Sequence, residues 1–300
     1  MLREAHAGND QPTVRRDLLD RLPTTGRQAV ALTGVRRSGK STLQRQLLQQ
    51  MGAGVHINFE DTRLFGLSPG DFPSVLRALD EHWRGQPVFL DEVQEVDEWQ
   101  RFVRALLDHG RFVCLTGSNA SLLGRELGSK LTGRHLSFEV LPFSYREFLA
   151  FTGSQPGPES LLAFLDEGGF PVALQERKPQ VLRELLRDVV QRDIASRHAL
   201  RTTRHLMNVT LFLLANTGQP FSLQHLTKAL AVPTVPQTSR AVEQLQDAYL
   251  LFAVQKWSAS FKQRVVAPAK YYAVDNGLRR ANSPSPSPDL GHRLENAIYL

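Results

Sequence analysis

The stretch LTGVRRSGKSTLQRQL, residues 32–47, decides the fold of this chain. It places Gly34 and Gly39 ahead of Lys40 and Ser41 in the spacing GxxxxGKS. Two glycines at this separation let the backbone curl so that successive amides point inward, which is the geometry that cradles a phosphate. The stretch therefore predicts a phosphate-binding P-loop.

The residues on either side of the loop supply the context that a P-loop requires. Residues 30–32 form a short apolar run typical of a buried strand, and the leucines that follow recur at helical spacing: Leu43, Leu47 and Leu48. A loop between strand and helix directs the positive helix end toward the anion. We expect Lys40 to reach the β and γ phosphates and Ser41 to bind Mg²⁺. The predicted nucleotide-binding set is Gly34, Val35, Arg36, Arg37, Ser38, Gly39, Lys40, Ser41 and Thr42.

A second motif supports the first, since GxxxxGKS alone occurs by chance in glycine-bearing turns. VFLDE, residues 88–92, is an apolar run that ends in two acids. A parallel sheet delivers such carboxylates to its carboxyl edge, beside the phosphate loop. We expect Asp91 to hold Mg²⁺ and Glu92 to polarise the attacking water. The alternative is that these acids only cap the helix that follows.

A third apolar run, residues 112–115, repeats the design and ends in polar side chains. Thr116, Ser118 and Asn119 follow it, and we expect Asn119 to sense the γ phosphate or to hold the water. Cys114, the single cysteine, lies inside the run and reads as a packed thiol without function.

The stretches TGSNASLLGRELGSKLTGR and LPFSYREFL resemble AAA-type ATPases that carry a DUF4143 C-terminal region. The resemblance continues through GGFP, RDIASR, KYYAVDNGLRRA and GHRLENAIYL, so it covers nearly the whole chain. It implies an ATPase with an AAA-like core, a helical lid, a winged helix and, beyond these, a fold similar to restriction endonucleases.

The same resemblance assigns an arginine that completes a neighbouring subunit's site. Arg134 of LTGR occupies that place and would act only in trans, in a homo-oligomer. The alternative is a surface arginine at a helix C-terminus. Arg125 is a weaker candidate, and we expect Arg36 and Arg37 to face solvent or a neighbour. The pattern offers no clear second sensor arginine, with Arg192 as a possible lid contact.

Composition limits the class of protein without assigning a function. The chain has 300 residues, 41% of them hydrophobic, and a formal net charge of +6, which favours polyanionic partners without locating them. No run approaches the roughly 18 apolar residues of a membrane span, and the first thirty residues lack the hydrophobic region of a signal peptide. We expect a cytoplasmic protein without a membrane partner.

The pattern predicts an α/β fold with a parallel-sheet P-loop core and four segments. These are an ATPase core (1–155), a helical lid (156–201), a winged helix (202–276), and a linker that leads into a truncated nuclease-like domain (277–300). GGFP, residues 168–171, reads as a helix stop and rigid turn. GHRLENAIYL begins a helix at the end of the chain, so we expect a fragment; its Glu295 resembles a nuclease acid, but one glutamate cannot build a nuclease site.

Three helical patterns, in residues 205–218, 221–232 and from 234 onward, predict a helix-turn-helix, and residues 250–257 and 261–275 are expected to form two strands of a wing. Ser222 reads as the N-cap of the second helix, and Gln237 or Thr238 opens the third. If this module binds double-stranded or branched DNA, the third helix contacts bases and the wing tip, residues 262–264, meets phosphate. The third helix holds one arginine and two acids, so service as a structural or protein-docking module stays open.

We therefore expect an oligomeric, Mg²⁺-dependent ATPase whose turnover moves the winged helix. A slow nucleotide-dependent switch that binds a protein or operator is the alternative. A kinase lacks an identifiable acceptor pocket, and the chain has no NKxD-type guanine reader, which favours ATP.

Overall fold

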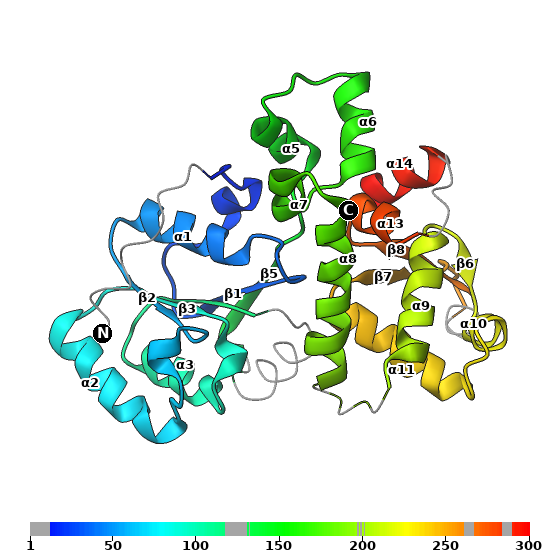
Figure 1. Cartoon of the computed structure of the whole chain (residues 1–300). Helices are drawn as coiled ribbons and strands as arrows, with labels where there is room; N and C mark the ends of the chain where they lie inside the picture. The colour runs from blue at the N-terminus through cyan, green and yellow to red at the C-terminus, as the bar shows by residue number, and fades with distance from the viewer. Residues whose placement is uncertain are drawn as a thin grey trace. The chain divides into compact units, whose positions relative to one another are not determined.

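The computed structural model describes residues 13–117, 131, 133–196, 198, 200, 202–260, 267–283 and 290–300 (Figure 1). The backbone contacts divide the chain into two compact units. The first comprises Met1–Gly34 and Gly39–Val140, and the second comprises Val35–Ser38 and Leu141–Leu300. Within the described ranges no helix has the length and apolar character needed to cross a membrane.

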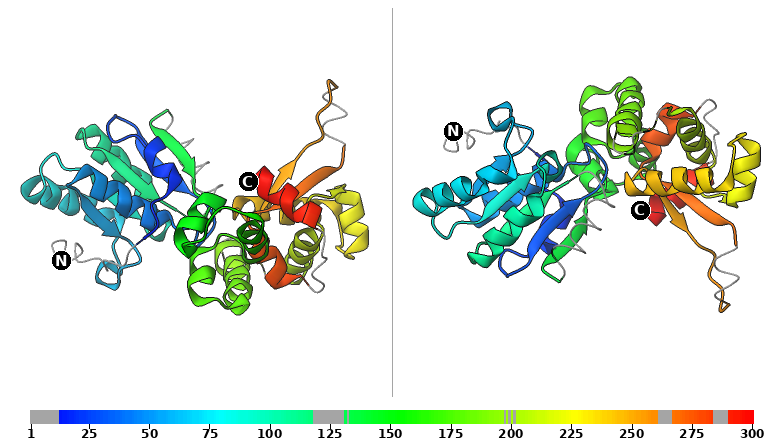
Figure 2. Two further views of the ribbon diagram at one scale, coloured as in Figure 1. Left: turned by 90° about the horizontal axis from the view of Figure 1, so that it is seen from above. Right: turned by 90° about the horizontal axis from the view of Figure 1, so that it is seen from below.

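The first unit is built on a five-stranded sheet in the order β2-β3-β4-β1-β5, in which every paired strand is parallel. Its strands are β1 (Ala29–Thr33), β2 (Val55–Asn58), β3 (Val88–Asp91), β4 (Val113–Thr116) and β5 (His135–Glu139). Helices cover both faces of the sheet (Figure 2): α1 (Lys40–Met51), α2 (Phe72–His82) and α3 (Trp99–Asp108). Short 3-10 turns lie at Asp17–Arg21, Thr62–Leu64, Pro69–Asp71 and Val93–Glu95.

Alternation along β1 shows how the sheet separates two apolar layers. Val30 and Leu32 pack with Leu43 and Leu47 of α1, whereas Ala29 and Ala31 belong to the cluster on the other face with α2 and α3. All five residues of β1 are buried, as a parallel strand covered on both sides requires. The predicted α/β core with a parallel sheet is confirmed.

The second unit is mainly helical. It contains a three-stranded antiparallel sheet in the order β6-β8-β7, with strands Pro220–Phe221, Ala269–Ala273 and Leu251–Val254 respectively. Its α-helices are α5 (Tyr145–Thr152), α6 (Pro158–Glu167), α7 (Pro171–Glu176), α8 (Pro179–Asp188), α9 (Arg204–Ala215), α10 (Leu223–Ala229), α11 (Val235–Asp247), α13 (Asn276–Asn282) and α14 (Leu290–Tyr299). A π-helix, Val189–Ser196, continues α8.

Local sequence signals fix several of these helix ends. The Ser144 side chain caps α5 and pairs reciprocally with Glu147, which is a capping box. GGFP acts as the predicted helix stop and turn, because Gly168 ends α6 at φ +76° and Pro171 opens α7. Ser222 caps α10 as predicted, accepting a hydrogen bond from His225 N.

The predicted start of the third helix was wrong. α11 begins at Val235, two or three residues before Gln237 and Thr238, because the Thr234 side chain supplies the N-cap and accepts from Gln237 N. A proline is tolerated in the first helical turn because the amides of that turn have no intrahelical acceptor. Pro236 therefore does not delay the start of the helix.

The compact units differ from the predicted division of the chain. The boundary falls between Val140 and Leu141 instead of near residue 155, so α5 belongs to the second unit. The predicted lid, winged-helix and C-terminal segments lie together in that unit. Buried Asp275 of the second of these segments joins all three, because its carboxylate accepts hydrogen bonds from Gly169 N at 2.6 Å and Leu278 N at 2.7 Å.

Candidate nucleotide-binding site

The glycine loop leaves the carboxyl end of β1 in a conformation that glycine makes possible. Gly34 has φ +141°, and a Cβ at this position would lie 2.3 Å from the carbonyl oxygen of Val140. Gly39 has φ +98° and forms the N-cap of α1. Since an L side chain rarely adopts such φ values and has no space at Gly34, the first glycine is required by both backbone and packing.

Lys40 begins helix α1 and lies back along the loop. It is only 4% exposed, and its Nζ donates to the Gly34 carbonyl oxygen at 3.0 Å. An ammonium held at this place lies where the amide dipoles at the start of α1 already favour an anion. The phosphate-contacting role of Lys40 stays a prediction, and the structure shows its ammonium group beside the backbone of the loop.

The middle of the loop, Val35–Ser38, is grouped with the second unit. Val35 is buried in that unit's apolar cluster, and Arg36 Nε lies 3.6 Å from Asp193 Oδ2 on the π-helix. Our expectation that Arg36 faces solvent or a neighbouring subunit was therefore wrong, because a buried carboxylate of the same unit pairs with it. Arg37 is exposed as expected, at φ +65°.

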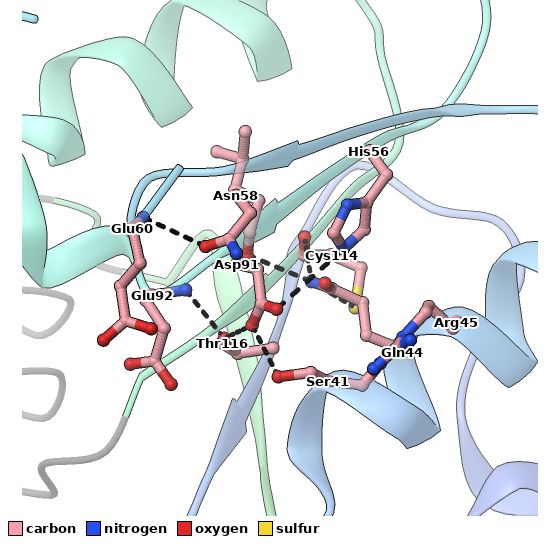
Figure 3. Close-up of polar contacts among 11 residues, drawn as sticks. Ser41, Gln44, Arg45, His56, Asn58, Glu60, Asp91, Glu92, Cys114 and Thr116 are labelled. Carbon is pink, nitrogen blue, oxygen red and sulfur yellow. Dashed lines mark hydrogen bonds and ion pairs between the residues drawn. The ribbon is translucent and has the colours of Figure 1, made fainter. Parts of the chain in front are cut away.

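Three side chains from three different elements converge at the end of the sheet (Figure 3). Ser41 Oγ donates to Asp91 Oδ1 at 3.0 Å, and Thr116 Oγ1 donates to the same oxygen at 2.5 Å. The strand order explains the convergence: β4 lies between β1 and β3, so Thr116 ends between the loop and the acidic pair. The structure thus brings the two predicted metal ligands, Ser41 and Asp91, into contact.

Glu92 follows Asp91 in a left-handed conformation, φ 53° and ψ 52°. A non-glycine residue there costs about 1 kcal/mol or more, and such outliers cluster at functional sites. Its backbone N donates to Thr116 Oγ1 at 3.0 Å, so one threonine hydroxyl contacts the Asp91 carboxylate and the backbone amide of Glu92. Glu92 precedes the Val93–Glu95 turn without a side-chain cap hydrogen bond, which excludes capping by Glu92 as the reason for this acid.

Sequence reasoning missed the residues that surround the acids because strand β2 was not predicted. His56 Nε2 lies 4.0 Å from Asp91 Oδ2, and Asn58 is the register partner of Asp91. The signal was present in VHIN, where Val55 and Ile57 alternate with polar residues. Gln44, also missed, donates from Nε2 to the carbonyl oxygens of Leu90 and Cys114 at 3.0 and 3.1 Å. It anchors α1 to β3 and β4.

Cys114 is fully buried beneath this edge of the sheet, and burial raises the pKa of its thiol. The prediction of a packed thiol is confirmed.

Several further predicted residues lie outside the residues that the structure describes. Asn119, the predicted γ-phosphate sensor, lies outside the described residues together with Ser118, and so does Arg125. The wing tip, residues 262–264, also falls outside them. Arg192 is described and is exposed on the π-helix.

Arg134 lies at the edge of the sheet opposite the loop. It directly precedes β5, whose first residue pairs with Ala29 while its last pairs with Thr33, next to the loop. At about 3.3 Å per residue, five residues place Arg134 roughly 16 Å from the loop edge. Its Nη1 pairs with Asp108 Oδ1 at 2.8 Å, and its side chain is 38% exposed. Arg134 is therefore not part of the site in its own chain.

The donor atoms at the loop suit Mg²⁺ and a nucleotide. Mg²⁺ prefers hard oxygen ligands and is commonly held by one or two protein groups together with substrate phosphates. Ser41 and Asp91 supply a hydroxyl and a carboxylate in contact. Among the described residues no group of three or more His, Cys, Asp or Glu side chains could hold a metal without such phosphates. The site fits Mg²⁺ bound with a polyphosphate.

Two family models match the chain. One is described as an AAA domain and matches residues 26–149. The other is a domain of unknown function, DUF8612, and matches residues 159–288. The C-terminal match is therefore to DUF8612 and not to the DUF4143 region that we expected.

Two curated relatives are uncharacterized proteins. A protein of Haemophilus influenzae is 32% identical over 290 residues, which cover 90% of this chain and 72% of the relative. The protein MJ1544 of Methanocaldococcus jannaschii is 31% identical over 288 residues, which cover 89% of this chain and 64% of the relative. The chain thus spans less than two thirds of the length of the latter.

Solved structures give a looser likeness. Cdc6p from Pyrobaculum aerophilum overlaps with a TM-score of 0.33 at 12% identity, covering 81% of this chain and 83% of that one. AMPPCP-bound DnaA from Aquifex aeolicus also gives 0.33 at 12% identity, covering 77% and 85%.

Proposed function

Because the chain belongs to one family with the Haemophilus influenzae protein and carries an AAA domain, we propose that it binds ATP with Mg²⁺ and hydrolyses it. The observation that carries the proposal is the contact of Ser41 with Asp91 beside the buried Lys40 of the glycine loop. A chance GxxxxGKS match would not be accompanied by a strand that delivers a carboxylate to the hydroxyl of that motif.

Each residue has a separate task in this proposal. Lys40 and the amides of the loop bind the phosphates, and Ser41 and Asp91 hold Mg²⁺, which neutralises charge on the phosphates when bound. Glu92 orients and polarises the attacking water. Thr116 positions the Asp91 carboxylate and the backbone of Glu92 through its hydroxyl. Because the chemistry needs positioning and charge compensation above all, small displacements of these groups are costly.

Two substitutions separate binding from turnover. Lys40→Ala abolishes ATP binding, measured with a fluorescent ATP analogue. Glu92→Gln keeps the affinity within about threefold and lowers kcat by about a hundredfold or more, the usual contribution of a positioned base. Glu95→Gln, on the exposed side of the neighbouring turn, is the matched control and leaves both constants unchanged. Equal loss of ATP affinity in Lys40→Ala and Glu92→Gln would refute these roles.

We place Arg134 as the arginine that acts on a neighbouring subunit's site. Its position at the sheet edge opposite the loop supports action in trans over action in its own site. A guanidinium supplied by a neighbour is a large part of phosphoryl-transfer catalysis in many nucleotide hydrolases. Turnover per chain should then rise with protein concentration.

We also propose that the second unit contains a winged helix that binds DNA. Its order of α9, β6, α10, α11, β7 and β8 supports the proposal that this segment is a winged helix. Helix α11 carries Arg240 together with Glu243 and Asp247, so its own attraction to phosphate is weak. ATPase rates with and without single-stranded, double-stranded and branched DNA test this role. Equal rates in all four conditions would leave the module a structural or protein-docking one.

A further inference from the structure

The segment before β1 is fastened to helix α1. Gln46 of that helix donates from Nε2 to the Val14 carbonyl oxygen at 2.7 Å and to Thr13 Oγ1 at 3.2 Å. Its Oε1 accepts from Arg16 N at 3.0 Å. Leu19 and Leu22 are buried in the same apolar cluster as the leucines of α1. These contacts give the backbone of residues 13–22 a defined place beside the helix that follows the glycine loop.

Because of these contacts, the side chains of the neighbouring Arg15 and Arg16 have different surroundings. The Arg15 side chain is 57% exposed and pairs with Asp20 at 2.6 Å. Arg16 is only 4% exposed, and its Nη1 lies 2.7 Å from where a Cβ would project from Gly39. The Arg16 guanidinium thus lies against the last glycine of the loop, one residue before Lys40.

The charge at this place favours a polyanion. The Arg16 guanidinium is a cation with several N–H donors. It lies at the N-terminus of α1, where the helix dipole disfavours cations, and Lys40 is a second cation that is 4% exposed there. An anion bound at the start of α1 interacts favourably with both of these cations and with the helix dipole. A guanidinium also donates two parallel hydrogen bonds to phosphate, which an ammonium cannot do.

We propose that Arg16 is a nucleotide-binding residue, whose guanidinium donates to phosphate oxygens of a nucleoside di- or triphosphate bound at the loop. The inference rests on the proposed nucleotide site and adds to it a cation from outside the loop motif. The first thirty residues gave no motif for it, because the arginine is brought to the loop by the contacts of Gln46 and the leucines.

The test compares neutral variants of the two adjacent arginines. Arg16→Met and Arg16→Gln raise the Kd for both ATP and ADP by tenfold or more. The Kd of Arg15→Met stays within twofold of that of the unmodified protein. The dependence of log Kd on log salt becomes shallower in the Arg16 variants, since one ionic contact with phosphate is lost, and a merely structural role would not change that slope. Thermal unfolding midpoints of all variants are measured alongside.

Three outcomes overturn the proposal. One is an unchanged Kd in the Arg16 variants. Another is a raised Kd with an unchanged dependence of log Kd on log salt. The third is failure of both neutral variants to fold, which would assign Arg16 to structure alone. If the unmodified protein and Arg15→Met bind neither nucleotide, the proposed function itself has failed, and that result is distinguishable from the other three.

Discussion

Thr116→Val removes one hydroxyl and keeps the shape of the side chain, so it isolates the contact that holds both acids. Thr116 is fully buried at the end of β4, donates to Asp91 and accepts from Glu92 N. Loss of a hydrogen bond to a carboxylate costs about 1.5–3 kcal/mol, and leaving a buried amide unpaired costs about 1–3 kcal/mol. We expect the free energy of unfolding to fall by about 2.5–6 kcal/mol, which most domains, stable by about 5–15 kcal/mol, survive.

The same change should lower turnover more than nucleotide binding. If poorer positioning of Glu92 and Asp91 raises the activation free energy of hydrolysis by only about 1.5–3 kcal/mol, kcat falls by about ten- to a hundredfold. The loop and Lys40 are not touched, so the ATP affinity measured in EDTA should stay within about threefold. The assays are steady-state phosphate release, fluorescent-nucleotide binding without Mg²⁺, and urea unfolding.

Thr210→Val is the matched control. Thr210 is also fully buried, but it lies in α9 and donates to the Leu206 carbonyl oxygen at 2.7 Å. The Thr210→Val variant should have a lower free energy of unfolding and an unchanged kcat. Our reading of Thr116 is refuted if Thr116→Val keeps its kcat while unfolding as expected, or if metal-free affinity falls as much as kcat.

Two further predictions concern pH and assembly. Burial raises the pKa of the Asp275 carboxyl from 3.8 to about 6, despite its hydrogen bond from Gly169 N, so the folded state binds this proton more tightly than the unfolded state. The free energy of unfolding should therefore fall, as pH rises from 4 to 7, by up to about 3 kcal/mol relative to Asp275→Asn, measured by urea unfolding; a parallel pH dependence in the two proteins would contradict this. Arg134→Ala breaks an exposed pair with Asp108, so stability should change by less than about 1 kcal/mol while kcat falls. Mixing it with Lys40→Ala should restore turnover, since each subunit supplies what the other lacks, and no recovery at any mixing ratio would count against action in trans.

The chemistry of the loop and the ends of several elements could be predicted from neighbouring residues alone. The spacing of Gly34, Gly39 and Lys40 dictates a curled loop because backbone conformation at glycine is a local property. The acids after an apolar run, the leucine spacing of α1 and the cap at Ser222 are local signals of the same kind. Strand β2 was missed because four residues with two polar positions carry too weak an alternation to stand out.

What the tertiary structure decided is which distant residues meet. Thr116 lies between Ser41 and Asp91 because β4 is inserted between β1 and β3, and strand order follows from the packing of both sheet faces. Arg36 pairs with Asp193, and Arg16 lies against Gly39, through contacts between segments far apart in the chain. A sequence specifies its own loops and helix ends through short-range sterics and hydrogen bonds. Contacts between distant segments depend on the free energy of the whole packed unit, so they cannot be predicted from a local pattern of residues.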